Sequence, residues 1–594
     1  MTMQTDYFYN EIQFPLPGNP GSRDLYFKTE QGLIDIDFEK KTVCLGENSI
    51  LDCGTYFNSI NVAQLKDYTK ITSVEIQLEV SGNLRIEIHR VTKNKNKIND
   101  TVSSILDLNE KEKTIVSFRV PVDGNYLIYY KIRSFCEGGC FFGGTLRYNT
   151  GVPVIPARLA VVICTFKRED HVYGNIKNIC ARLSELNLCD GVEIYISDNG
   201  NSLEVKRIDY DNVHVYPNKN AGGSGGFTRG FIELVRSGRN HTHVLVMDDD
   251  ILIDPEVLVK TYNFISCIKD EISNYFVGGS FLDIDKPCVQ VEAGGRIREG
   301  DPIAQNTNKR LNELSSLLHS PVPDYDYFGW WYCCFPRKFL DNGYTLPIFI
   351  KRDDIEFCYR NKSKTILFNG IGVWHEHYLK KFSFENTYYQ ARNNLILNAI
   401  HFPDRQLPEI IDEVRRVVSG YIKSRRYCLA EMYLLGVEDF LKGYRWLMET
   451  DVTDLHQTLR GKTIKQIPFD NEIIDRRDGA DCRDCKNNAT RLTLKNRLTM
   501  NGHLFSFSKK VGVVPINIQD EALFMDFNEV FFYNASTGLA YSEKKSFSRF
   551  VRLTFWCRNV CRKLAKQYHE VLYSYNVNLT KMVNEAFWKK YLGI

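Results

Sequence analysis

Up to about residue 150 the chain alternates between apolar and polar positions, which is the spacing of half-buried β-strands. The runs IEIHRV, TIVSFRV and GNYLIYYKI show this alternation most clearly, and turn signals such as PVDGN separate the runs. The pattern predicts an all-β sandwich or barrel over residues 1–152, for which glycan binding is one expected role.

The pattern changes after Pro153 and Pro156. RLAVVICTF and HVLVM are continuous apolar runs, typical of strands buried on both faces, and helical stretches alternate with them. A glycine loop at 222–226 is expected to precede a helix that starts at Phe227. Residues 153–385 are therefore predicted to form an α/β domain around a mostly parallel, doubly wound sheet, whose ligands lie at the carboxyl ends of the strands.

Residues 386–594 are predicted to be mostly helical, because runs such as YYQARNNLILNAI place apolar residues three and four positions apart. Residues 546–571 mix aromatic with basic side chains, as a basic amphipathic helix does. Such a helix can lie on an anionic membrane surface, but an ordinary packed helix with a solvated basic face would have the same pattern.

The amino-acid composition limits the classes of protein to which the chain can belong. Hydrophobic residues make up 43% of the 594 and charged residues 25%, as in globular proteins, and the formal net charge is +3. A nearly balanced charge gives no global reason to bind nucleic acid. No apolar run is long enough to span a membrane, and the start lacks the pattern of a secretion signal.

The 17 cysteines are odd in number and scattered along the chain, which favours reduced thiols in a cytoplasmic protein over a disulfide framework. Cys482 and Cys485 form a single CxxC without a clear second ligand pair. Free thiols in a polar loop are the favoured interpretation there, and a structural zinc ion is the alternative.

The most informative motif is Asp248-Asp249-Asp250, directly after the apolar strand HVLVM. In an extended segment, residues two apart point the same way, so Asp248 and Asp250 are expected to converge on one point. Two carboxylates suit Mg²⁺ or Mn²⁺, which also take phosphate oxygens. A solvated acidic turn is the alternative, but the position at a strand end of a doubly wound sheet favours a metal site for a nucleotide-sugar enzyme.

The glycine loop lies about twenty residues before this motif and opens a helix, so its backbone amides are candidates for phosphate contact. It matches neither a P-loop nor a dinucleotide fingerprint. Polar residues also lie at the ends of the two strands that come before this loop. They are expected either to bind the nucleotide or simply to form turns. The expected donor-site residues are Thr165, Arg168, Asp198, Gly225, Gly226, Arg229 and Asp249.

Three further motifs supply candidate chemistry. Trp330 and Trp331 offer flat apolar platforms for sugar rings, although aromatic clusters are more often core. A helix is expected to begin near Asp353 and to keep Asp353 or Asp354 ionised as a base, with simple capping as the alternative. His375 follows a predicted strand and is a candidate third metal ligand that favours Mn²⁺, with His377 as the alternate.

The order of these motifs resembles that of bacterial polymerising galactofuranosyltransferases, which are inverting GT-A enzymes of glycosyltransferase family two. The resemblance rests on ICTFKR, SDNG, GGSGGFTRG, MDDDI, GWWYCCFP, FIKRDD and VWHE, which span roughly residues 155–395. It implies a central GT-A domain, a UDP-galactofuranose donor and a growing cell-surface glycan, free or lipid-linked, as acceptor.

The resemblance also implies roles for single residues. Asp248, Asp250 and His375 match the family's metal ligands. Asp354 matches its general base and Asp353 the acceptor-positioning partner. Trp330 and Trp331 match the acceptor-site tryptophans. The enzyme is expected in the cytoplasm or at the inner face of the cytoplasmic membrane, and whether it forms a homo-oligomer is left open.

Three alternatives remain at this stage. The first is an inverting transferase that uses a pyranose or rhamnosyl nucleotide-sugar donor. The second is a non-catalytic glycan-binding protein with a degenerate transferase fold, which the complete set of candidate metal, base and platform residues disfavours. The third is a nucleotidyltransferase. This hypothesis is weaker, because no basic glycine-rich loop lies near the N-terminus.

Overall fold

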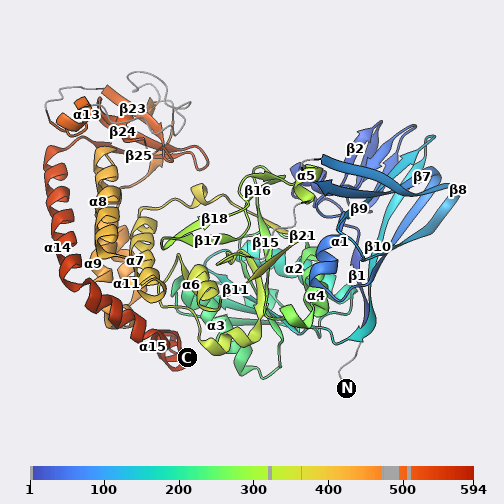
Figure 1. Ribbon diagram of the computed structural model, residues 1–594, viewed down its shortest axis with the longest axis horizontal. Coiled ribbons are helices and arrows are strands. Elements are labelled where there is room, and N and C mark those ends of the chain that lie inside the picture. Colours follow the sequence, from blue (N-terminus) through green and yellow to red (C-terminus); the bar gives the residue numbers. More distant parts are fainter. Residues whose placement is uncertain are drawn as a thin grey trace.

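The structure is a computed structural model, and it describes residues 5–594 except 96, 319–323, 363, 471, 474–493, 505–509 and 519. The N-terminal sheet, a central α/β part and a C-terminal helical part lie side by side in Figure 1, with the central part in the middle. The fold is therefore mixed α/β, as the sequence predicts, with an N-terminal β part and a helical C-terminal part. Cys482 and Cys485 lie outside the described residues.

The N-terminal part is a ten-stranded sheet in which every strand pairing is antiparallel. Its longest strands, β7 and β8, pair with each other along most of their length. The predicted boundary at residue 152 falls inside the last of these strands, β10. The strands are β1 (Thr5–Glu11), β2 (Lys28–Gln31), β3 (Ile34–Asp37), β4 (Thr42–Leu45), β5 (Ile50–Asp52), β6 (Ile60–Asn61), β7 (Ser73–Asn94), β8 (Lys97–Pro121), β9 (Leu127–Ser134) and β10 (Gly139–Val154).

The central sheet has nine strands, in the order β13-β12-β11-β14-β20-β15-β16-β19, with β21 beside β15. The strands β13, β12, β11 and β14 are parallel, whereas β20 runs antiparallel between β14 and β15. These strands are β11 (Leu159–Thr165), β12 (Val192–Asp198), β13 (Val213–Pro217), β14 (His243–Asp248), β15 (Phe276–Asp283), β16 (Val289–Glu292), β19 (Lys309–Arg310), β20 (Tyr332–Pro336) and β21 (Thr365–His375).

Helices cover both faces of this sheet, which explains the continuous apolar runs of its strands. Along β11, Val161 and Ile163 belong to a core shared with helices α2 (Glu169–Glu185) and α4 (Pro255–Cys267). Val162 faces the other way, into a core shared with α3 (Gly222–Arg236) and α6 (Asp353–Arg360). The sheet is therefore wound on both sides, as the sequence predicts.

The N-terminal and central parts share one hydrophobic core. Trp374 of β21 is fully buried, and its ring lies 5.6 Å from that of Phe57 and 6.4 Å from that of Tyr26, centroid to centroid. The Tyr56 hydroxyl donates to the carbonyl of Ile371 at 2.8 Å. The N-terminal part thus supports the strand that ends at His375.

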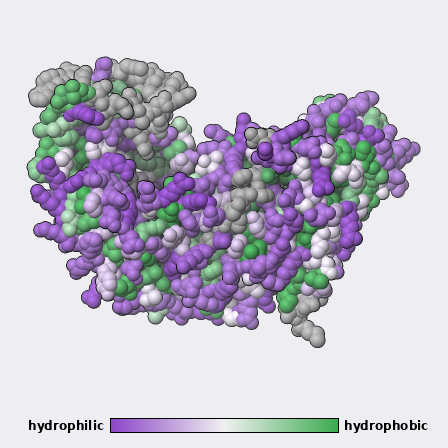
Figure 2. Space-filling view, viewed as in Figure 1, coloured by the Kyte–Doolittle hydropathy of each residue, from purple (hydrophilic) through white to green (hydrophobic). Residues whose placement is uncertain are grey.

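The C-terminal part is built on long helices. The longest helix in the described residues, α14, contains the predicted 546–571 segment apart from Ser546, which caps its N-terminus. The C-terminal part also carries a four-stranded sheet that the periodicity did not predict, of which β23 (Lys510–Pro515), β24 (Phe527–Asn534) and β25 (Leu539–Lys544) are the main strands. The outline in Figure 2 is concave between this part and the N-terminal sheet. The helices include α7 (Phe384–His401), α8 (Leu407–Lys423), α9 (Tyr427–Phe440), α10 (Gly443–Glu449), α11 (Val452–Arg460), α14 (Phe547–Val577) and α16 (Glu585–Leu592).

None of the helices in the described part of the chain is both long and apolar enough to cross a membrane.

Candidate active site

Three neighbouring strands bring predicted site residues to the same edge of the central sheet. Thr165 at the end of β11 pairs with Asp198 at the end of β12, and Cys164 pairs with Asp248 at the end of β14. Because parallel strands end at a common edge, residues far apart in sequence become neighbours there. The edge on which the sequence predicts a site therefore carries Thr165, Asp198 and Asp248 together.

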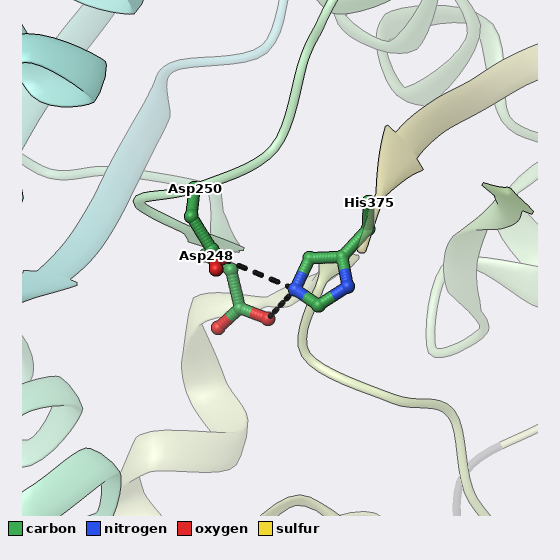
Figure 3. A group of neighbouring side chains, drawn as sticks. All are labelled: Asp248, Asp250 and His375. Carbon is green, nitrogen blue, oxygen red and sulfur yellow. Dashed lines mark ion pairs between the residues drawn. The ribbon is translucent and has the colours of Figure 1, made fainter. Parts of the chain in front are cut away.

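Asp248, Asp250 and His375 form a cluster in which one ligand atom from each lies within 4.8 Å of the others. The His375 Nε2 atom lies 3.1 Å from Asp250 Oδ1 and 3.5 Å from Asp248 Oδ2, and both contacts are drawn in Figure 3. The Asp248 side chain is 37% exposed, whereas that of Asp250 is only 3% exposed. The predicted convergence of the two aspartates is thus seen, with one of them accessible from outside.

A short backbone pairing explains how His375 reaches the aspartates. Leu252, just beyond the triple-aspartate turn, forms an antiparallel bridge with Trp374, with N–H···O distances of 2.8 and 3.0 Å. This bridge holds the end of β21 against the segment that follows β14. His375, rather than His377, joins the cluster, since the Nδ1 atom of His377 instead accepts a hydrogen bond from the Leu379 amide at 3.3 Å.

The ring of His375 is oriented by the backbone of the next residue, Glu376. Its Nδ1 atom lies 2.7 Å from the Glu376 carbonyl oxygen, which can only accept, so Nδ1 carries the proton. That tautomer leaves Nε2 facing the two carboxylates. A histidine whose second nitrogen is held in this way is the usual arrangement of an imidazole metal ligand.

Both the ionised state of Asp250 and the types of ligand in the cluster suit a divalent cation. Arg168 Nη1 lies 2.7 Å from Asp250 Oδ2. Although burial opposes ionisation, His375 and Lys381 hold the pKa of Asp250 well below its usual range. Asp250 is therefore an ionised, buried carboxylate that is stabilised by positive charge. Two carboxylates and one imidazole are a suitable set for Mn²⁺.

Asp249, between the two clustered aspartates, points elsewhere, as strand geometry predicts. It is buried, and burial first, then the neighbouring Asp250 and Asp248 charges, raise its pKa to about 6, against the stabilising effect of the Thr165 hydroxyl. Asp249 and Thr165 thus lie near each other at the strand ends. Whether they contact a nucleotide stays a prediction.

The glycine segment differs from the prediction. It is the first turn of α3, which begins at Gly222, rather than a loop before the helix. A Cβ atom at Gly226 would clash with the sulfur of Cys164, and one at Gly222, where φ is +66°, would clash with the carbonyl of Phe349. These glycines therefore allow the helix to approach β11 and the 349–352 segment closely.

Gly225 is also buried in this turn, while Arg229 lies one turn further along. The Arg229 Nε atom lies 3.3 Å from Glu233 Oε1, and its guanidinium stacks over Tyr216. Asp198 accepts hydrogen bonds from the amides of Gly200, Ser202 and Leu203 at 2.7 to 2.9 Å. Both residues thus have structural partners, and donor contacts by them stay predictions.

Helix α6 begins at Asp353, as predicted, and places the paired aspartates near the metal cluster. Burial first, then the charges of Asp354 and Asp248, raise the pKa of Asp353 to about 8. Burial also raises the pKa of Asp354, while its backbone hydrogen bond and Arg352 oppose that rise. Because the charge of Asp248 contributes to both pKa values, the triple-aspartate turn lies near the start of α6.

The two tryptophans have different surroundings. Trp330 is 4% exposed and packs edge-on against Phe227 and Phe357, and its indole nitrogen has no hydrogen-bond partner. Trp331 is half-buried, donates its indole N–H to the Gly279 carbonyl at 2.7 Å, and accepts the Asp248 amide through its own carbonyl at 3.4 Å. Trp331 is thus directly beside the metal cluster.

Two residues at this site were not predicted from the sequence. Lys381 contacts both Asp250 and His375. Glu292, at the end of β16, has its pKa raised to about 7 by burial and by the charge of Asp354. Neither stands in a motif, since Glu292 follows an ordinary short strand and Lys381 belongs to a basic pair that would equally suit a surface turn.

Comparisons with known proteins indicate the class to which the chain belongs. The sequence profile of the family described as "Galactofuranosyltransferase 2 N-terminal" matches residues 10–141, within the N-terminal sheet. Galactofuranosyltransferase GlfT2 of Mycolicibacterium smegmatis (strain ATCC 700084 / mc(2)155) is 26% identical over 473 residues, which is 73% of this chain and 71% of that protein. GlfT2 of Mycobacterium tuberculosis (strain ATCC 25618 / H37Rv) is 24% identical over 471 residues, or 73% and 72%.

Among solved structures, that of GalNAc-T7 with UDP, GalNAc and Mn²⁺ is 11% identical, with a TM-score of 0.27 over 37% of this chain and 43% of that one. The assignment of the chain to a class of enzyme rests on its sequence relatives. The chain is a glycosyltransferase. Within that class it is similar to the galactofuranosyltransferases, which confirms the resemblance drawn from its motifs and extends it to the N-terminal sheet.

Proposed function

We propose that this chain transfers galactofuranose from UDP-galactofuranose to a growing cell-surface glycan by a metal-dependent, inverting single displacement on a GT-A fold. The observation that carries the proposal is the convergence of Asp248, Asp250 and His375 beside the paired aspartates that open α6. The named activity of the two GlfT2 relatives supports the choice of sugar.

The donor lies at the carboxyl edge of the sheet in this proposal. Asp248, Asp250 and His375 would hold Mn²⁺ or Mg²⁺, which when bound would supply positive charge to the departing diphosphate. Arg168 is 2.7 Å from Asp250 and can turn its remaining donors to the diphosphate. The other proposed donor contacts come from Thr165, Asp198, Asp249, Gly225, Gly226 and Arg229.

Asp354 is the proposed general base. Its carboxylate accepts the proton of an acceptor hydroxyl, whose oxygen forms a bond to the anomeric carbon. The bond from that carbon to the diphosphate oxygen breaks, and its electron pair leaves with UDP. Attack from the face opposite UDP gives a β-galactofuranosyl linkage.

Asp353 is proposed to position the acceptor together with the tryptophans. Of these, Trp331 is the better placed, because it is half-buried and its backbone contacts Asp248. Trp330 lies in the apolar core beneath it, so its contribution is expected through packing and through its unpartnered indole N–H.

A peripheral membrane contact at the inner face of the cytoplasmic membrane also belongs to the proposal. Phe547 and Phe555 of α14 are 51% and 59% exposed, which suits insertion at an interface. Part of the basic face of α14 is used internally, because Arg549, Arg552 and Lys563 pair with carboxylates. Sedimentation with anionic vesicles, compared between the wild type and a Phe547→Ser/Phe555→Ser variant, tests this contact.

A donor comparison tests the proposed reaction. The purified chain is incubated with Mn²⁺, a synthetic lipid-linked galactofuranosyl acceptor and either UDP-galactofuranose or UDP-galactose, and the products are analysed by NMR. We expect β-galactofuranosyl extension with the furanose donor and little turnover with the pyranose. Preferential use of UDP-galactose would refute the donor assignment, and UDP release from neither donor would refute catalysis.

A further inference from the structure

One side chain competes for the metal-binding atoms of the candidate site. Lys381 ends the short turn η5 (Tyr378–Lys381), which follows β21. Its Nζ atom lies 2.7 Å from Asp250 Oδ2 and 2.9 Å from His375 Nε2. The ammonium group thus contacts two of the three groups that are proposed to hold the cation.

The contact with His375 excludes a simultaneous metal bond. Nδ1 of His375 donates its proton to the Glu376 carbonyl, so Nε2 is the ring nitrogen left to bind a metal ion. The Lys381 ammonium lies 2.9 Å from this atom and 2.7 Å from Asp250 Oδ2, so it fills the position of a cation bound to both. A metal ion bound to the same two atoms needs that position, so Lys381 must move before His375 can bind one.

We propose that Lys381 occupies the cation position of the donor site until the metal arrives, and that it then moves to contact the diphosphate of the nucleotide sugar. This inference rests on the proposed function of the site. The lysine ammonium is a compact charge on a flexible four-carbon stem, which suits it for two positions better than a rigid guanidinium. Arg168 remains paired with Asp250 when Lys381 moves.

The surroundings of Lys381 permit a movement of the side chain without one of the backbone. Its carbonyl accepts from Asn386 Nδ2 at 3.0 Å, and the Leu379 carbonyl accepts from Asn534 Nδ2 of β24 at 2.6 Å. The Lys381 side chain is 35% exposed, so it has open space beside the cluster. The turn is thus anchored at both ends while the ammonium can leave.

The neighbouring lysine provides a matched control. Lys380 points away from the cluster and pairs with Asp285 at 2.8 Å. Lys380→Met therefore removes the same charge, one residue away, without freeing His375 Nε2. Lys381→Met removes the competing ammonium and keeps the apolar stem, and Lys381→Gln serves as a second variant if the first does not fold.

The experiment measures Mn²⁺ affinity without nucleotide, by the EPR signal of free Mn²⁺, and UDP affinity at saturating Mn²⁺, by calorimetry. We expect Lys381→Met to bind Mn²⁺ about tenfold more tightly, since a competing charge is lost, and to bind UDP about tenfold more weakly, since a charged contact is lost. Lys380→Met is expected to stay within about twofold of the wild type in both, as exposed pairs do.

Unchanged or weaker Mn²⁺ binding by Lys381→Met, in a wild type that does bind Mn²⁺, would overturn the role of Lys381 and leave the proposed metal site intact. Equal tightening in both variants would also overturn it, because it would show a general charge effect. A wild type that binds no Mn²⁺ would contradict the proposed metal site itself, and the role of Lys381 with it.

Discussion

The Nε2 atom of His375 lies 3.1 Å from the Asp250 carboxylate, although His375 ends β21 and Asp250 follows β14. The bridge between Leu252 and Trp374 produces this contact, and Trp374 in turn packs on the N-terminal part. The metal site therefore depends on the whole fold rather than on one loop.

Replacing Asp250 or His375 with alanine should abolish Mn²⁺-dependent UDP binding, because each substitution removes one of three candidate ligands. Isothermal titration of UDP with and without Mn²⁺ measures the effect. Asp285→Ala is the control, since Asp285 is an exposed aspartate that pairs with Lys380. Unchanged titrations of the Asp250 and His375 variants would count against the site.

Asp354→Asn should lower turnover by about 10²–10⁴-fold, the usual contribution of a general base, while UDP binding stays near that of the wild type. The amide keeps the shape of the side chain but cannot take up the proton. Initial rates with UDP-galactofuranose, together with UDP calorimetry, separate the two effects. Normal turnover in this variant would remove Asp354 from its proposed role.

The pH profile should depend on Arg352. Burial raises the pKa of Asp354, and the charge of Arg352 opposes that rise. Since the base acts when ionised, activity falls as the pH drops through its pKa. Arg352→Gln removes the stabilising charge, so the acid limb of kcat/KM should move to higher pH.

The same profile for Arg337→Gln serves as the control, because Arg337 pairs with Asp341 on the surface. That variant should leave the acid limb unchanged. An acid limb that stays in place or moves to lower pH in Arg352→Gln would show that Arg352 does not stabilise the ionised base.

Gly226→Ala should destabilise the protein by about 1–3 kcal/mol, the usual cost of overpacking, because the added methyl group clashes with Cys164 between α3 and β11. Gly174→Ala in α2 is the matched control, since a methyl group there meets no neighbour within 4 Å. It should be neutral or stabilise by up to about 1 kcal/mol. Thermal denaturation measures the melting temperature of each variant. Equal melting temperatures for both would contradict the packing role of Gly226.

The sequence predicts those parts of the site that depend on local pattern. Apolar runs reveal strands buried on both faces, and the strand end at Asp248 and the helix start at Asp353 follow from neighbouring residues. Alternation within an extended segment likewise predicts that Asp248 and Asp250 converge while Asp249 diverges.

Features set by distant contacts could not be predicted in this way. The glycines at 222–226 suggest a loop, and only the nearness of Cys164 and Phe349 explains why a helix begins there. Trp330 and Trp331 are adjacent, yet the packing of Phe227 and Phe357 buries the first more deeply. Lys381 reaches the site only because β21 ends beside the triple-aspartate turn.

The central claim is that three separated stretches of chain hold a cation and a base on opposite sides of one reacting carbon. Anomalous diffraction at the manganese edge, from crystals grown with Mn²⁺ and UDP, tests it most directly. We predict one strong peak bonded to Asp248, Asp250, His375 and the diphosphate, with the Asp354 carboxylate facing the open side of UDP. A peak at other residues, or an Asp354 carboxylate turned away from the nucleotide, would contradict the account.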